Sequence, residues 1–450
     1  MRRLAALALL TLAAVPAGAA AQEGRIGPDL KITGNGRALA PEGRLTPLGT
    51  FPTGSALSPD GRFLWAVDSG HDANDVRIVE VATGRVRQVL PLPGGYGGVA
   101  FAPDGRRAFV SGTPKGSSTP AGPTKGDAGD VLHVFAVDPA DGRATEQDPI
   151  ALPATSGGSG QRNSLPPVSK VWPEGLGVAP DGRTVAVALN QADRVALVDV
   201  AAGTARAVTV GAYPFAALFS ADGKEAYVTN EYDGTVSVVD VAAGRQVATI
   251  DVGGRNAHPE GMALDAARGR LYVAVANRDR VAAIDVRARK VAWSVDVGRA
   301  EAPGAQPVGL ALSPDGAVVI AANEGEDALA VVATGAAPAA ASPRTVVRVR
   351  RPSTLPRLGR RSRWHVAKGM RGPRRRACAG PSRAAEARYV KIALRALRRH
   401  RGAVALRAYR RLPRVAACPP PLGAKEPRLL GRVPTAAFPM DVEVSPDGRT

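Results

Sequence analysis

Short apolar runs alternate with polar turns along most of the chain. The segment EAYVTNEYDGTVSVVDVAAGRQVATIDVGG (225–254) contains three apolar runs, separated by a polar turn and by an Asp-x-x-x-Gly turn. The Ser-Ala-Asp-Gly turn before it recurs in similar form at 58–61, 102–105, 179–182, 313–316 and 445–448. Asp-Gly between runs rich in Val, Ile and Tyr predicts β-hairpins, because glycine supplies the positive φ that the turn requires.

Each repeating unit contains four predicted strands. The turn aspartates are 44 residues apart between Asp60 and Asp104, and 41 apart between Asp181 and Asp222. The next spacing is 93 residues, to Asp315, which corresponds to two units. Four strands at this period are typical of a β-propeller. We therefore predict an all-β, seven-bladed β-propeller.

The seventh unit begins near the end of the sequence. Residues 22–342 are expected to hold blades 1–6, and 429–450 to begin blade 7, which is incomplete in this chain. The strand-like segment 27–49 can add an outer strand to that blade. Because an incomplete blade would expose a sheet edge, we expect the chain to be part of a longer protein.

The motifs also carry a family resemblance. Tyr227-Val228-Thr229-Asn230, with the SPDG and VVDVAAG turns, resembles the YVTN family of β-propeller repeats. TGNGRALAPEGRLTPLGTFPTGSALSPDG and LLGRVPTAAFPMDVEVSPDG resemble secreted bacterial proteins in which a propeller precedes an alkaline-phosphatase-like phosphoesterase domain. The resemblance implies a catalytic domain after Thr450, with a divalent metal as its cofactor. No cofactor is evident in these 450 residues themselves.

Positive charge is concentrated in one segment. The formal net charge is +19, but residues 341–432 hold 27 basic and 2 acidic residues, or +25, which leaves −6 for the remainder. The basic insertion at 343–428 contains an apolar stripe, from Tyr389 to Leu397, that predicts a partly helical structure. Cys378 and Cys418 bracket this stripe and are expected to form a disulfide, with free thiols as the alternative.

The N-terminus predicts export. Arg2 and Arg3 precede the apolar run LAALALLTLAAV, and AGAAA follows, which is typical of a signal peptide (1–21) cleaved after Ala21. We expect a secreted or envelope-associated monomer, for which nucleic acid is not a partner. The insertion 343–428 is then a candidate contact for anionic cell-envelope polymers or lipid headgroups, or a solvated segment without a dedicated partner.

A proline-containing tetrapeptide precedes the predicted inner strands, and the residues beside the proline vary. The tetrapeptides are FPTG (51–54), WPEG (172–175), YPFA (213–216), HPEG (258–261), QPVG (306–309) and FPMD (438–441). All are expected at one end of the ring, where loops carry ligand sites. An unknown ligand there would meet Trp172 and Tyr213, and Glu174, His258 and Glu260 are candidates for acid–base chemistry.

The same carboxylates and histidine can instead hold a divalent ion, cap loops or pair with arginines. We assign no metal site, because the sequence contains no HExxH, GxSxG or Cys-His metal spacing. The sequence favours an exported binding or scaffold module at the front of a larger phosphoesterase-like hydrolase. The alternatives are that the propeller is itself a lactonase-type hydrolase, or that it is a structural envelope protein.

Overall fold

The computed structural model describes most of the repeat region. It covers residues 45–49, 51–69, 74–92, 94–112, 130–153, 158–159, 171–298, 304–335, 426–434 and 440–448, with short strands at 24–25, 31–32, 38–39, 364–365 and 380–381. The predicted signal peptide, the predicted helix and both cysteines lie outside these residues. Within them, no helix combines the length and apolarity needed to cross a membrane.

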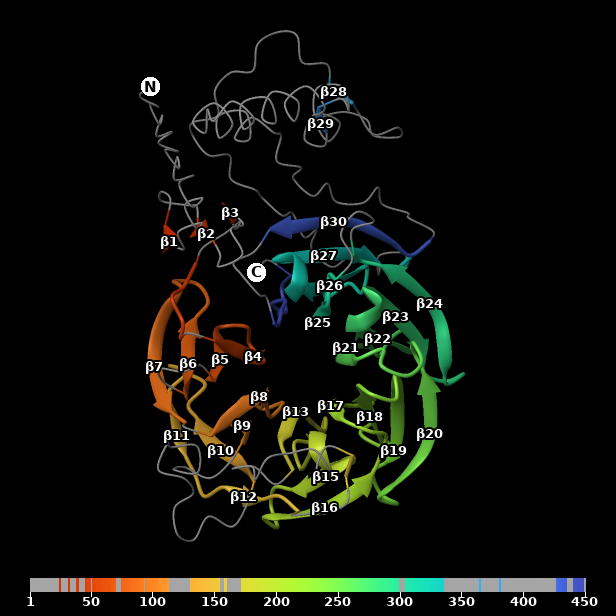
Figure 1. The fold of residues 1–450 in the computed structure, drawn as a ribbon. Helices are drawn as coiled ribbons and strands as arrows, with labels where there is room; N and C mark the ends of the chain where they lie inside the picture. Colours follow the sequence, from red (N-terminus) through yellow and green to blue (C-terminus); the bar gives the residue numbers. More distant parts are fainter. Residues whose placement is uncertain are drawn as a thin grey trace, which may run out of the picture.

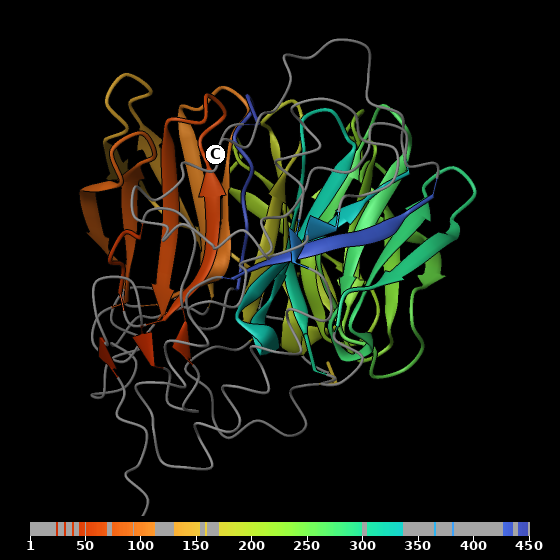
Figure 2. The ribbon, with the colours of Figure 1, turned by 90° about the horizontal axis from the view of Figure 1, so that it is seen from above.

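Six antiparallel sheets form a ring, each with its first strand toward the centre and its last strand on the outside (Figure 1). The view turned by 90° shows the strands running roughly along the axis of the ring (Figure 2). This confirms the predicted all-β propeller and the predicted strand order within each unit.

The first three sheets precede residue 210. They consist of β4 (Pro52–Leu57), β5 (Phe63–Ser69), β6 (Asn74–Glu80) and β7 (Arg85–Pro91); β8 (Gly95–Phe101), β9 (Arg107–Gly112) and β10 (Val131–Val137), with β11 (Ala144–Glu146) and β12 (Ile150–Ala151) both paired to β10; and β13 (Pro173–Val178), β14 (Thr184–Leu189), β15 (Arg194–Asp199) and β16 (Thr204–Thr209).

The other three sheets follow. They consist of β17 (Pro214–Phe219), β18 (Glu225–Asn230), β19 (Thr235–Asp240) and β20 (Arg245–Asp251); β21 (Pro259–Asp265), β22 (Arg270–Val275), β23 (Arg280–Asp285) and β24 (Lys290–Asp296); and β25 (Pro307–Leu312), β26 (Val318–Asn323), β27 (Ala328–Ala333) and β30 (Arg428–Pro434). Single 3₁₀ turns, η2 (Asn190–Ala192), η3 (Ala276–Arg278) and η4 (Glu324–Glu326), follow the second strands of sheets three, five and six.

The Asp-Gly turns have the conformation that the sequence predicts. In the first, Gly61 has a φ of +73°, and Asp60 Oδ1 accepts hydrogen bonds from Ser58 Oγ at 2.6 Å and from the backbone N–H of Arg62 at 3.0 Å. The aspartate thus holds the turn while glycine provides the left-handed φ.

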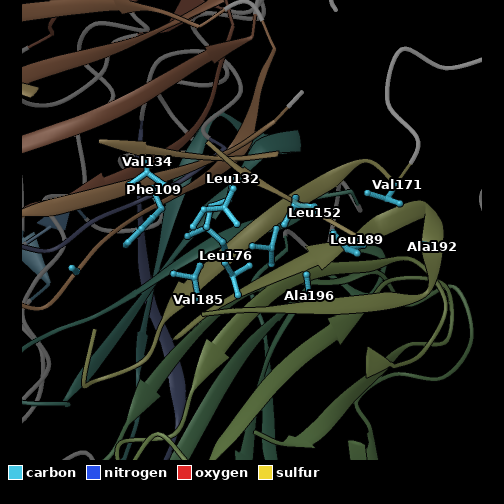
Figure 3. Packing of buried hydrophobic residues seen from close by; sticks show 14 residues of the cluster. Phe109, Leu132, Val134, Leu152, Val171, Leu176, Val185, Leu189, Ala192 and Ala196 are labelled. Atoms are coloured by element: carbon cyan, nitrogen blue, oxygen red, sulfur yellow. The ribbon is translucent and has the colours of Figure 1, made fainter. Parts of the chain in front are cut away.

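Apolar side chains fill the space between neighbouring sheets. Figure 3 shows one such cluster, in which Phe109 and Leu132 from the second sheet pack with Val185 and Leu189 from the third. Between the first and second sheets, the fully buried Trp65 makes edge-on contacts to Phe101 and Phe135, with ring centroids 5.3 and 5.4 Å apart. Each blade therefore relies on its neighbours for much of its core.

The sixth sheet is completed from the far side of the basic insertion. Strand β30 (Arg428–Pro434) pairs antiparallel with β27 (Ala328–Ala333), and Arg432 donates to the carbonyl of Val297 at 2.6 Å and pairs with Glu326 at 2.9 Å. The expected boundary, in which residue 429 begins a seventh blade, is therefore corrected. An outer strand is needed to cover the edge of β27, and 428–434 supplies it.

The prediction of seven blades is also corrected: the described residues form six complete sheets. Residues 440–448 lie between the first and sixth sheets, where the Asp441 carboxylate accepts hydrogen bonds from Ser55 N and Oγ, both at 2.9 Å. Their turn repeats the Asp-Gly geometry, with Ser445 Oγ donating to Asp447 Oδ1 at 2.7 Å. They supply an innermost segment and a turn, but within the described chain no further strand pairs with them.

The N-terminal strands do not fill this position as expected. Strands β1 (Gly24–Arg25), β2 (Lys31–Ile32) and β3 (Ala38–Leu39) pair only with one another among the described residues. A second isolated pair, β28 (Trp364–His365) with β29 (Gly380–Pro381), falls within the basic insertion.

Candidate functional site

Each of the six innermost strands is distorted near its first residue. These first residues lie at one end of the ring, which we call the proline end. In β13, the register shifts between Pro173 and Leu176, so two residues oppose one on β14. The equivalent shift in β21 falls between Pro259 and Met262. Such bulges redirect side chains out of the regular sheet, and Glu174 and Glu260 lie inside them.

The residues before the prolines have an unusual backbone. Trp172, Tyr213, His258 and Gln306 all have φ between +49° and +55°. Residues other than glycine rarely adopt this left-handed backbone conformation, and backbone strain of this kind is common at ligand sites. Backbone hydrogen bonds hold the conformation: the N–H of Glu231 donates to the carbonyl of Tyr213, and the N–H of His258 donates to the carbonyl of Glu231.

Three side chains converge between the fourth and fifth sheets. Ligand atoms of Glu231, His258 and Glu260 all lie within 4.8 Å of one another, and each residue retains some exposed surface. His258 Nδ1 is 3.5 Å from Glu231 Oε1. Asn190 Nδ2 donates to Glu231 Oε2 at 3.0 Å and also to the carbonyl of Pro214, which fixes the orientation of the Glu231 carboxylate.

Two further glutamates extend this group. Glu174 accepts a hydrogen bond from Trp172 Nε1 at 2.5 Å, and it interacts electrostatically with Glu231 and Glu260. Glu324, at the position in sheet six equivalent to Glu231 in sheet four, interacts with Glu260. In the described residues, no Lys or Arg forms an ion pair with any of these four glutamates; His258 is their only positively chargeable partner.

The pKa values of these groups reflect enclosure by protein. Burial raises the pKa of Glu174 to about 8, although the N–H of Trp172 opposes the rise. Burial, and then the neighbouring carboxylates, raise the pKa of Glu260 well above its ordinary value. The hydrogen bond to Glu231 raises the pKa of His258, while burial partly opposes it. Glu174 therefore carries a proton at neutral pH and is able to donate it.

Aromatic and basic side chains lie beside the group. The rings of Tyr213 and Tyr232 have centroids 6.1 Å apart, and the guanidinium of Arg255 stacks 4.5 Å above the Tyr232 ring. Trp172 is 36% exposed. These side chains give the proline end an amphipathic rim that can contact a ring-shaped ligand.

The sequence pointed to some of these residues and missed others. Glu174, His258 and Glu260 do lie at the proline end, and Trp172 and Tyr213 lie on its rim. Glu231 and Glu324 were missed because neither flanks one of the recurring prolines; each instead directly follows an asparagine, Asn230 or Asn323. In each sheet, the residue that pairs with the first proline of the innermost strand marks an equivalent position. By this criterion Asp68, Asn230 and Asn323 are equivalent to one another, and Asn190 is equivalent to Glu231. The Asn-Glu pairs at 230–231 and 323–324 were the available signal.

Two family models match the chain. The model described as "Lactonase, 7-bladed beta-propeller" matches residues 176–338, which include Glu231, His258, Glu260 and Glu324. The model described as "Outer membrane protein assembly factor BamB" matches residues 15–249, more than half of the 450 residues. Neither supports the expected phosphoesterase association, and the YVTN assignment stays a prediction.

Solved structures share the fold. Hydrazine synthase of Kuenenia stuttgartiensis is 19% identical with a TM-score of 0.52, covering 90% of this chain and 93% of that chain. A putative 6-phosphogluconolactonase from Bacteroides uniformis is 19% identical with a TM-score of 0.51, covering 68% and 87%. The periplasmic gluconolactonase of Pseudomonas aeruginosa is 21% identical with a TM-score of 0.49, covering 68% and 87%. At these identities the likeness shows the fold alone. No curated protein matches the sequence.

Proposed function

Because the chain belongs to the β-propeller family described as outer membrane protein assembly factor BamB, and because residues 176–338 also match the lactonase propellers, we propose that it is an exported hydrolase that opens uncharged lactones at the proline end of the ring. The observation that carries the proposal is Glu174, a bulge carboxyl beside the group formed by Glu231, His258 and Glu260.

The arrangement separates the two proton transfers of ester hydrolysis. The group of Glu231, His258 and Glu260 offers carboxylate and imidazole acceptors for a proton of the attacking water. As the water oxygen bonds to the carbonyl carbon and the ring C–O bond breaks, Glu174 gives its proton to the leaving ring oxygen. General acid–base catalysis by positioned groups of this kind typically contributes about 10²–10⁴-fold to rate.

Charge defines the proposed substrate class. Of the four glutamates at the proline end, Glu174 holds a proton at neutral pH, and His258 is the only cationic partner that the described residues give the other three. A phosphorylated or carboxylated lactone would be repelled there, whereas a neutral ring can lie against Tyr213 and Trp172.

Export to the periplasm or cell envelope is part of the proposal. The predicted signal peptide at 1–21 and the family description of the match to 15–249 support it.

A second candidate is a binding module without chemistry, as the sequence first favoured. The stacked Tyr213, Tyr232 and Arg255 favour it, because aromatic and guanidinium faces bind ring-shaped ligands without catalysis. A phosphoesterase association is not proposed.

A lactone panel tests the proposal. The full chain should hydrolyse neutral five- and six-membered lactones faster than phosphorylated ones, and Glu174→Gln should lower kcat by roughly 10²–10³-fold. Wild-type activity should fall as pH rises through about 8, where Glu174 loses its proton. Asp148→Asn, which changes an exposed carboxylate outside the site, is the control. Binding without turnover favours the second candidate, and turnover unaffected by Glu174→Gln refutes the assigned role.

A further inference from the structure

The three side chains that converge at the proline end have the composition of a metal site. We infer that Glu231, His258 and Glu260 bind one divalent transition-metal ion, of the Zn²⁺ or Mn²⁺ type, between the fourth and fifth sheets. The inference goes beyond lactone opening, because an ion can bind there whether or not a lactone is the substrate.

The distances suit a shared ion. Two donor atoms bound to one tetrahedral Zn²⁺ at about 2.0–2.1 Å lie roughly 3.4 Å apart. His258 Nδ1 and Glu231 Oε1 are 3.5 Å apart, and the donor of Glu260 falls within the 4.8 Å limit of the group. All three residues are half-buried, so their ligand atoms remain accessible to an ion.

Neighbouring groups orient the ligands. Asn190 Nδ2 holds the second oxygen of Glu231, so Oε1 is left facing His258. Thr229 Oγ1 donates to the backbone carbonyl of Glu260 at 2.9 Å, which fixes the strand from which that carboxylate projects. Hydrogen bonds of this kind around ligating side chains are a regular feature of metal sites.

The electrostatic setting favours a cation. Glu324 adds a further carboxylate within interaction range of Glu260. Arg255, the basic side chain that approaches the rim, lies over the Tyr232 ring, and the described residues contain no ion pair between it and any glutamate of the group. The group thus has more carboxylates than the one histidine can balance, and a divalent ion supplies the missing charge.

The donor set decides the kind of ion. Imidazole nitrogen favours Zn²⁺ and related transition ions over Ca²⁺ and Mg²⁺, which prefer six or more oxygens. Three protein ligands leave a position for water, as in catalytic rather than structural zinc sites, and a bound ion of this class lowers the pKa of that water.

Co²⁺ tests the site directly, because ligation by protein side chains in a four- or five-coordinate site produces visible absorption bands far more intense than those of hydrated Co²⁺. The full chain, freed of metal with a chelator, should take up one Co²⁺ with such bands, and excess Zn²⁺ should displace it. Glu260→Gln and His258→Asn should each weaken binding by more than about 100-fold, since they remove direct ligands. Asparagine is chosen at 258 because it tolerates the φ of +51°.

Two further variants separate ligation from general charge. Asn190→Ala should weaken binding by about 10–100-fold through loss of orientation. Glu324→Gln removes the same charge as Glu260→Gln without removing a ligand, and it should change binding by less than tenfold. Circular dichroism checks that each variant folds.

Three results would overturn the inference: no Co²⁺ bands in the wild type, equal losses in Glu324→Gln and Glu260→Gln, or uptake of Ca²⁺ in preference to Zn²⁺. The Co²⁺ titration contains no lactone. A negative result would therefore overturn the metal site alone, and the lactone panel would still test the proposed hydrolysis.

Discussion

Replacing Glu174 by glutamine should stabilise the protein increasingly as pH rises. The ordinary pKa of this carboxyl is 4.5, and in the folded protein burial raises it to about 8. Between these values the folded state keeps a proton that the unfolded state has released, so the stability of the wild type falls with rising pH. Glutamine does not titrate and still offers an oxygen to the N–H of Trp172.

The size of this change in the free energy of unfolding follows from the interval between the ordinary pKa and the pH of the assay. At pH 7.5 the difference from 4.5 is three pH units, and at about 1.4 kcal/mol per unit the cost of burial reaches about 4 kcal/mol as an upper limit. Glu174 keeps some exposed surface, so water offsets part of that cost. We expect Glu174→Gln to gain about 2 kcal/mol at pH 7.5.

Urea unfolding at pH 4.5, 6 and 7.5, followed by tryptophan fluorescence, measures this gain. The difference between Glu174→Gln and wild type should be near zero at pH 4.5 and should grow steadily. Asp148→Asn, in an exposed loop, serves as the matched control and should show no such growth. A difference independent of pH, or a variant less stable than wild type at pH 7.5, would refute the reasoning about burial.

Two other predictions concern the contacts between sheets. Gly261→Ala should cost about 1–3 kcal/mol in urea unfolding, because its Cβ would lie 2.4 Å from the Val308 carbonyl oxygen in the next blade; unchanged stability would show that the strands separate easily. Arg432→Met should lower the free energy of unfolding by about 2–3 kcal/mol, because it leaves the carboxylate of Glu326, only 4% exposed, without its guanidinium. Adding Glu326→Gln should recover part of that loss, and no recovery would contradict a role for the ion pair.

The candidate site could be predicted only in part from the sequence. The X-Pro tetrapeptides located the proline end, and Glu174, His258 and Glu260 were found because they flank recurring prolines. Glu231 was not found, since its role depends on a side chain from the next sheet. The distance of 3.5 Å to His258 spans 27 positions of the chain, and the bulge at Pro259 helps to set it.

Adjacent residues determine strands and turns, so the sequence alone established the hairpins, their order within each blade and the all-β ring. Glycine at φ +73° beside Asp60 is a local requirement that a short motif expresses fully. Tertiary structure decided which strand covers each outer edge. Strand β30 reaches β27 across the whole basic insertion, because an exposed edge accepts any compatible strand and a longer loop adds little entropic cost. It also decided which carboxylates meet, since packing of blades rather than spacing in the chain brings Glu231 to His258.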